Sequence, residues 1–246
     1  MIEYDYHHTE SVRFQLKELY EKRWYKNGIC KMFDDCRGKK IPKDYWLLFD
    51  RTVRLGDNYC MLFNDKPLRI VFMGKETLGF SDHVVRPALM SDFPEGLNRH
   101  YAVTLKTLRY MLNADKNALT NDTVLSMYSL TNLYSCAFCN YPEQTQGIPN
   151  STTQIRNCLT LKKEEMEILK PTVLVLQTKD IRANDLYEDA IDVEIVLPDN
   201  YGKLKYSNKN ECYIIESCHP SNKHHPWKKD LYACINYLKD NTVLPN

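Results

Sequence analysis

The chain has 246 residues, of which 43% are hydrophobic and 26% charged, and its formal net charge is +1. This composition is ordinary for a globular protein that buries a sizeable core. The near-neutral charge excludes a general attraction to nucleic acid, so any such binding needs local basic patches. No apolar run is long enough to span a bilayer and the N-terminus is no secretion signal. We therefore expect a cytoplasmic protein that does not enter a membrane.

The elements predicted from hydrophobic periodicity alternate between helices and strands. Helices are expected at residues 9–26, 97–112, 151–170 and 227–240. Strands are expected at 66–74, which pairs with 56–65 as a hairpin, and at 124–132, 171–178 and 211–221. Such alternation is typical of an α/β protein with a parallel sheet. No linker or internal repeat divides the chain, so one domain over residues 1–246 is the simplest organisation.

Three of the predicted strands end in sequence that is rich in chemical groups. One ends in Gly74-Lys75-Glu76, another ends in Asn132, and the third continues into Ser217-Cys218-His219-Pro220-Ser221. Ligands of open α/β sheets bind beyond the carboxyl ends of the strands. We therefore expect these three segments to converge on one crevice.

Cysteines and basic residues provide the other motifs. The nine cysteines of a cytosolic protein indicate metal ligands or buried small side chains rather than disulfides. Cys136 and Cys139 form a C-x-x-C spacing, which is compatible with a thiol redox site, a zinc clip or one edge of a larger metal site. Basic stretches occur at 36–43 ("CRGKKIPK") and 222–229 ("NKHHPWKK"). Charge alone does not distinguish them from solvated surface segments.

Taken together, the three strand ends resemble the uracil-DNA glycosylase superfamily. The segment "LTNLYSC…QIRNCLTLKKEEMEILKPTVLVLQ", within 130–177, is most similar to the iron–sulfur branch of that superfamily. There a T-N-x-x-x-C segment precedes a helix with another cysteine, then "LKP" and a hydrophobic strand. The resemblance implies a three-layer αβα sandwich around a short, mostly parallel four-stranded sheet. It runs from about residue 66 to the C-terminus, and residues 1–65 would pack on the core formed by 66–246.

The resemblance also implies a [4Fe–4S] cluster, since soft thiolate ligands suit iron–sulfur centres. Zinc held by the same thiolates is the alternative. Cys30 and Cys36 would be the first two ligands, and five residues separate them where the family usually has two. Cys139 is a rival to Cys136 as the third ligand. Cys60, Cys212, Cys218 and Cys234 fit buried packing better. The implied ligands are Cys30, Cys36, Cys136 and Cys158.

Catalytic roles follow from the same resemblance. Asn132 would pair with the edge of a base flipped out of the DNA, because an amide offers both a donor and an acceptor. His219 would donate a hydrogen bond to the departing base anion. Glu76 would orient the attacking water or stabilise the sugar cation, although the loop lacks the proline of the family's G-E-x-P-G pattern. The base pocket would be formed by Gly74, Lys75 and Phe80.

The second basic stretch would then contact DNA. Ser221 would bind a phosphate, and the residues that mix charge with aromatic rings would contact phosphates and enter the minor groove: Lys223, His224, His225 and Trp227. The resemblance thus implies a DNA glycosylase that removes uracil or a modified pyrimidine. No lysine stands in an obvious Schiff-base position, so we expect it to be monofunctional, and nothing in the sequence requires more than a monomer. Three alternatives stay open: a defence glycosylase that excises a hypermodified base from phage DNA, a non-catalytic iron–sulfur DNA-binding module, and a C-x-x-C redox protein.

Overall fold

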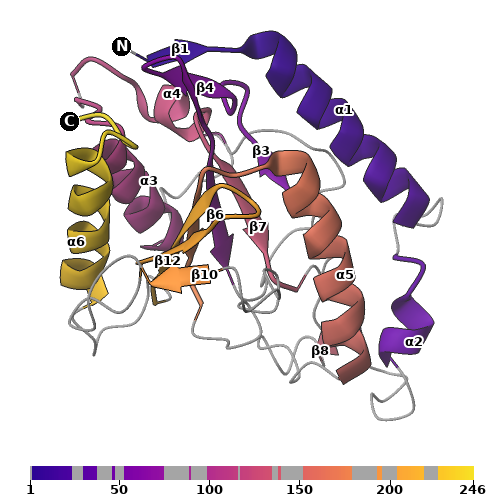
Figure 1. The fold of residues 1–246 in the computed structure, drawn as a ribbon. Helices are drawn as coiled ribbons and strands as arrows, with labels where there is room; N and C mark the ends of the chain where they lie inside the picture. The colour runs from indigo at the N-terminus through magenta and orange to yellow at the C-terminus, as the bar shows by residue number, and fades with distance from the viewer. Residues whose placement is uncertain are drawn as a thin grey trace.

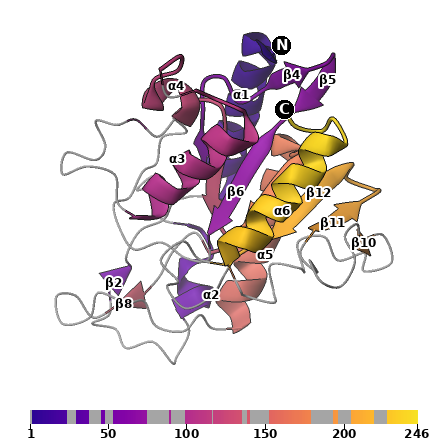
Figure 2. The ribbon, with the colours of Figure 1, turned by 90° about the vertical axis from the view of Figure 1, so that its left-hand side faces the viewer.

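A seven-stranded sheet lies between two layers of helices in the computed structural model of the protein (Figures 1 and 2). The strand order is β10-β11-β12-β9-β6-β7-β3. The residues that the structure describes are 2–23, 30–37, 46–47, 53–74, 89, 99–115, 117–134, 138–139, 152–178, 193–195, 204–218 and 227–246.

Parallel strands form the centre of the sheet and antiparallel strands form its edges. The parallel strands are β6 (Ile70–Gly74), β7 (Ser129–Asn132), β9 (Val173–Leu176) and β12 (Cys212–Glu216). The antiparallel strands are β3 (Arg54–Leu55), β10 (Val193–Ile195) and β11 (Leu204–Ser207). The predicted α/β class with a mostly parallel sheet is confirmed. The predicted four-stranded sheet is wrong, because three antiparallel strands that the resemblance did not imply extend the four parallel strands at both edges.

The two faces of the sheet carry separate hydrophobic cores. Phe72 and its neighbours pack against α3 (Arg99–Met111) and α6 (Trp227–Asp240). Val71 and Met73, on the other face of the same strand, pack against α1 (Tyr6–Arg23) and α5 (Thr152–Leu169). Successive residues of β6 thus face opposite helix layers, as the period of a strand requires. The result is a three-layer αβα arrangement.

Two of the predicted strands differ from the strands in the structure. The predicted strand 66–74 is divided between β5 (Lys66–Leu68) and β6, which belong to different sheets. The predicted strand 124–132 begins as helix α4 (Asn121–Leu125), because the Thr120 hydroxyl caps that helix by accepting a hydrogen bond from the Thr123 amide at 3.1 Å. Only the second half of the segment is a strand.

The remaining elements are short. Strand β5 pairs with β4 (Met61–Phe63) as the predicted hairpin, and β1 (Ile2–Tyr4) pairs with β4. Elsewhere β2 (Trp46–Leu47) pairs with β8 (Phe138–Cys139), and α2 (Phe33–Arg37) packs against α5. Within the described ranges, no helix combines the length and apolar character that crossing a membrane requires.

Candidate functional site

The carboxyl ends of the four parallel strands lie along one edge of the sheet. Gly74 of β6 is paired with Asn132 of β7. On its other side β6 is paired with β9, which is paired in turn with β12, so that Leu176 lies beside Glu216. The structure therefore brings together the three strand ends that the sequence predicts to converge, with β9 between two of them.

Gly74 and Asn132 are in direct contact at this edge. The backbone amide of Leu133 donates a hydrogen bond to the Gly74 carbonyl at 2.8 Å. A β-carbon added to Gly74 would lie only 2.5 Å from Oδ1 of Asn132. The Asn132 amide thus lies against the α-carbon of Gly74, and glycine is the residue that leaves room for it. Sequence reasoning placed both residues in the site but did not predict this contact.

Strand β9 contributes polar groups that the sequence analysis missed. Gln177 and Thr178 follow the strand directly and are buried. The Gln177 backbone amide donates to the Met73 carbonyl at 2.7 Å, and its side-chain Nε2 donates to Thr104 Oγ1 of α3 at 3.1 Å. The available signal in the sequence was that two polar residues directly follow the apolar run "VLVL".

Another polar residue, Ser217, directly follows β12 and precedes His219 by two residues. The Ser217 amide donates to the Leu176 carbonyl at 2.8 Å, which extends the pairing with β9 past the end of β12. The Ser217 hydroxyl is buried and has no hydrogen-bond partner in the part of the chain that the structure describes. The hydrogen bond to Leu176 therefore holds the chain at this edge of the sheet as far as Ser217, two residues before His219.

Three of the four predicted cluster ligands are neighbours. Cys36 lies on α2 and Cys158 on α5, and Asn157 Nδ2 donates a hydrogen bond to the Cys36 sulfur at 3.4 Å. Burial raises the pKa of the Cys36 thiol to about 11. The Asn157 hydrogen bond opposes this shift in pKa, whereas the nearby Cys158 and Cys30 thiols add to it. The packing agrees with this, since α2 contacts α5 and Cys30 packs against the core cluster that contains Cys158.

These three sulfurs alone do not form a metal-binding site. Among the described residues, no group of three or more histidine, cysteine, aspartate or glutamate side chains is arranged to hold a metal ion. The fourth predicted ligand, Cys136, lies outside those residues. Its rival Cys139 lies in β8, where it is paired with Trp46.

Most of the other predicted site residues also lie outside the described part of the chain, and their roles stay predictions. These are Lys75, Glu76, Phe80, His219, Ser221, Lys223, His224 and His225. Trp227 is described only as the first residue of α6. The described half of the site therefore consists of Gly74, Asn132 and the ends of β9 and β12.

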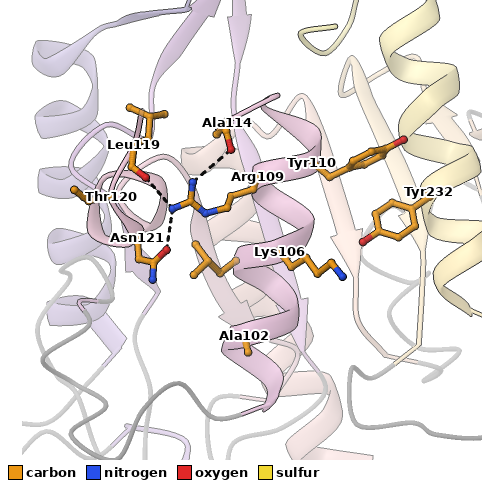
Figure 3. A pocket seen from close by; sticks show the side chains of 10 residues that line it. Ala102, Lys106, Arg109, Tyr110, Ala114, Leu119, Thr120, Asn121 and Tyr232 are labelled. Atoms are coloured by element: carbon orange, nitrogen blue, oxygen red, sulfur yellow. Dashed lines mark hydrogen bonds between the residues drawn. The ribbon is translucent and has the colours of Figure 1, made fainter. Parts of the chain in front are cut away.

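A cavity of about 800 Å³ lies elsewhere, along α3 between α4 and α6 (Figure 3). Arg109 lines this cavity, and its guanidinium group forms hydrogen bonds within the protein. It donates to the Leu119 carbonyl and to Asn121 Oδ1, each at 2.8 Å, and to the Ala114 carbonyl at 3.4 Å. This cavity shares no lining residue with the strand-end edge. Because the Arg109 guanidinium holds the neighbouring loop in place, we do not assign the cavity to the site.

Comparison with models of known protein families and with curated proteins finds no match to the chain. Any assignment of function consequently depends on the motifs of the sequence and the geometry of the strand-end edge.

Proposed function

We propose that the protein is a monofunctional DNA glycosylase, which takes a base out of the DNA stack and hydrolyses its N-glycosidic bond to leave an abasic site. The observation that carries this proposal is the Asn132 amide against Gly74 at the carboxyl edge of the parallel sheet. An amide held at that edge can both donate to and accept from the edge of a pyrimidine. Extrusion of the base costs a few kcal/mol, which such contacts offset.

The chemistry would be divided among three side chains. Asn132 would hold the extruded base by its edge. His219, which follows the end of β12, would donate a hydrogen bond to the base as negative charge develops on it, and a preorganised donor of this kind is worth about 3 kcal/mol. Glu76, two residues beyond Gly74, would orient the attacking water or stabilise the positive sugar.

Support for a thiolate-bound cluster comes from the neighbourhood of Cys30, Cys36 and Cys158. Together with Cys136 these residues would hold a [4Fe–4S] cluster, or zinc as the alternative. When bound, the group would cross-link α2 to α5. The cysteines of this region supply soft sulfur ligands, and the Asn157 side-chain amide donates a hydrogen bond to the Cys36 sulfur.

The cluster is tested by cysteine replacement. Cys158→Ala should remove the brown colour and the iron of the purified protein. The matched control is Cys234→Ala, since Cys234 is also buried but lies on α6, in the core on the other face of the sheet. Metal analysis separates iron and sulfide from zinc. Full cluster absorbance in Cys158→Ala would exclude that residue as a ligand.

DNA would be bound beyond His219. Ser221, Lys223, His224 and His225 would contact phosphates and the minor groove, and Trp227 would complete this surface at the start of α6. Neutralising phosphates releases counterions, so binding to DNA should weaken as the salt concentration rises.

The activity is tested by measuring free bases by mass spectrometry. The substrates are a uracil-containing duplex and phage DNA rich in modified pyrimidines, and the variants are His219→Ala and Asn132→Ala. Asn241→Ala is the matched control, because Asn241 is an exposed asparagine that donates to the Tyr237 carbonyl at 2.8 Å. Release that both site variants abolish and the control preserves supports the proposal.

Other outcomes discriminate between the alternatives. Release of a modified base alone would indicate a defence glycosylase. No release from either substrate by folded, metal-loaded protein would contradict a glycosylase. DNA binding without release would then favour a non-catalytic module.

A further inference from the structure

A charged pair lies in the core between α5 and the sheet. Lys162 and Glu165 are both fully buried, and Lys162 Nζ lies 2.7 Å from Oε1 and 2.8 Å from Oε2 of Glu165. Removing two charges from water is costly, and replacement of such a pair by apolar residues of similar size is often neutral or stabilising. Stability alone therefore does not explain why this core contains charges.

The pair is part of a closed network that reaches strand β7. Lys162 Nζ also donates to Thr131 Oγ1 at 3.0 Å, and the Thr131 hydroxyl donates to Glu165 Oε2 at 2.9 Å. Tyr20 of α1 donates to Glu165 Oε1 at 2.9 Å and accepts a hydrogen bond from the Val53 amide at 3.0 Å. The Lys162 ammonium thus makes three hydrogen bonds, one for each of its hydrogens.

The position of this network relates it to the proposed site. Thr131 immediately precedes Asn132, and its side chain is directed to the α5 face of the sheet, where Lys162 and Glu165 lie. On α5, Lys162 follows Cys158 by four residues, so the two lie on the same side of the helix. One helix face therefore carries a candidate cluster ligand and the ion pair that holds the residue before Asn132.

We propose that Lys162, Glu165 and Thr131 act as positioning residues that fix the end of β7, and so place the Asn132 amide against Gly74. The catalytic half of this inference rests on the proposed glycosylase function. The claim that the network fixes the end of β7 does not depend on that function, because it can be measured on the protein without a substrate. The Leu133 amide, which bonds the Gly74 carbonyl at 2.8 Å, reports on that strand end directly.

The experiment compares Thr131→Val with Thr131→Ser, which keeps the hydroxyl. Thr107→Val is the matched control, because Thr107 is also buried and its hydroxyl bonds within α3, to the Val103 carbonyl at 2.9 Å. A triple variant, Thr131→Val with Lys162→Met and Glu165→Leu, removes both charges and the Thr131 hydroxyl. The Tyr20 hydroxyl loses Glu165 as its acceptor but still accepts from the Val53 amide. It keeps the test valid if the single variant does not fold.

Three quantities are measured: the melting temperature, hydrogen exchange at Leu133 relative to Val175 in the central strand β9, and kcat and KM for base release. For the triple variant we expect a melting temperature near that of the wild type, faster exchange at Leu133 and unchanged exchange at Val175. We expect kcat to fall by about tenfold or more, since misplacement by a fraction of an ångström is costly to catalysis. KM should change much less, and Thr131→Ser should behave as wild type.

Each result decides the inference. Unchanged exchange at Leu133 in the triple variant would show that the network does not fix the strand end, and would overturn it. Faster exchange with unchanged kcat in an active enzyme would overturn the catalytic half. If the wild-type protein releases no base, the proposed function fails, and exchange at Leu133 alone still decides whether the network positions β7.

Discussion

Replacement of Gly74 by alanine should displace the Asn132 amide while leaving the fold intact. Gly74 lies in β6 with a backbone conformation that alanine can adopt, so the change adds one methyl group without backbone strain. That methyl carbon would lie 2.5 Å from Oδ1 of Asn132. The atom that it meets is the end of a flexible side chain, which can move away.

The size of the effect follows from this distance. Contact between nonbonded heavy atoms is most favourable at about 3.5 Å, so the amide must retreat by about 1 Å. A misplacement of about 1 Å in a catalytic constellation can cost about 100-fold in rate. We therefore expect kcat/KM for base release to fall by about 100-fold, equivalent to about 2.7 kcal/mol of transition-state stabilisation.

The assay pairs base release with thermal unfolding, and Gly56→Ala is the contrasting variant. A β-carbon on Gly56 would overlap the backbone of Ser126, which cannot rotate aside. Gly56→Ala should therefore lower the melting temperature, whereas Gly74→Ala should not. The side-chain amide resonance of Asn132 in an NMR spectrum reads the displacement without any substrate.

Two results would refute this reasoning. If Gly74→Ala kept kcat/KM within about threefold of wild type, a displacement of about 1 Å would not matter and Asn132 would not hold the base. If the Asn132 resonance did not move, the predicted contact with Gly74 would be wrong.

The remaining predictions concern stability. Lys162→Met alone should lower the free energy of unfolding by about 3–5 kcal/mol, because it leaves Glu165 buried without its charged partner, whereas the triple change Thr131→Val/Lys162→Met/Glu165→Leu should cost much less in urea titrations. Tyr59→Phe should cost about 1 kcal/mol, since its hydroxyl donates to the Leu169 carbonyl at 3.1 Å. Tyr128→Phe should cost nothing, because the buried Tyr128 hydroxyl has no partner among the described residues. Burial raises the pKa of both phenols well above 10. The neutral form is thus favoured by folding, so stability should be full below pH 10 and fall as the pH rises above it, and the double Tyr→Phe variant should show a weaker fall in melting temperature.

Local sequence predicted the principal helices and the central strands. The closing helix was predicted with the bounds that α6 has, and the helix over 151–170 differs from α5 by one residue at each end. These segments have apolar residues at a regular period, which is a local property. The error at residues 124–132 has the opposite cause, since an apolar run of that length fits a strand or a helix, and the Thr120 cap decides for a helix at its start.

The sequence by itself therefore determined the α/β class and the motifs at the strand ends, because periodicity and motifs are read from neighbouring residues. Only the tertiary structure decided which groups meet. The contact between Gly74 and Asn132, the hydrogen bonds of Lys162 and Glu165 to Thr131, and the shared neighbourhood of Cys36 and Cys158 join residues that are far apart in the chain. Such contacts depend on strand order, register and the packing of α5 on the sheet, and no local pattern encodes them.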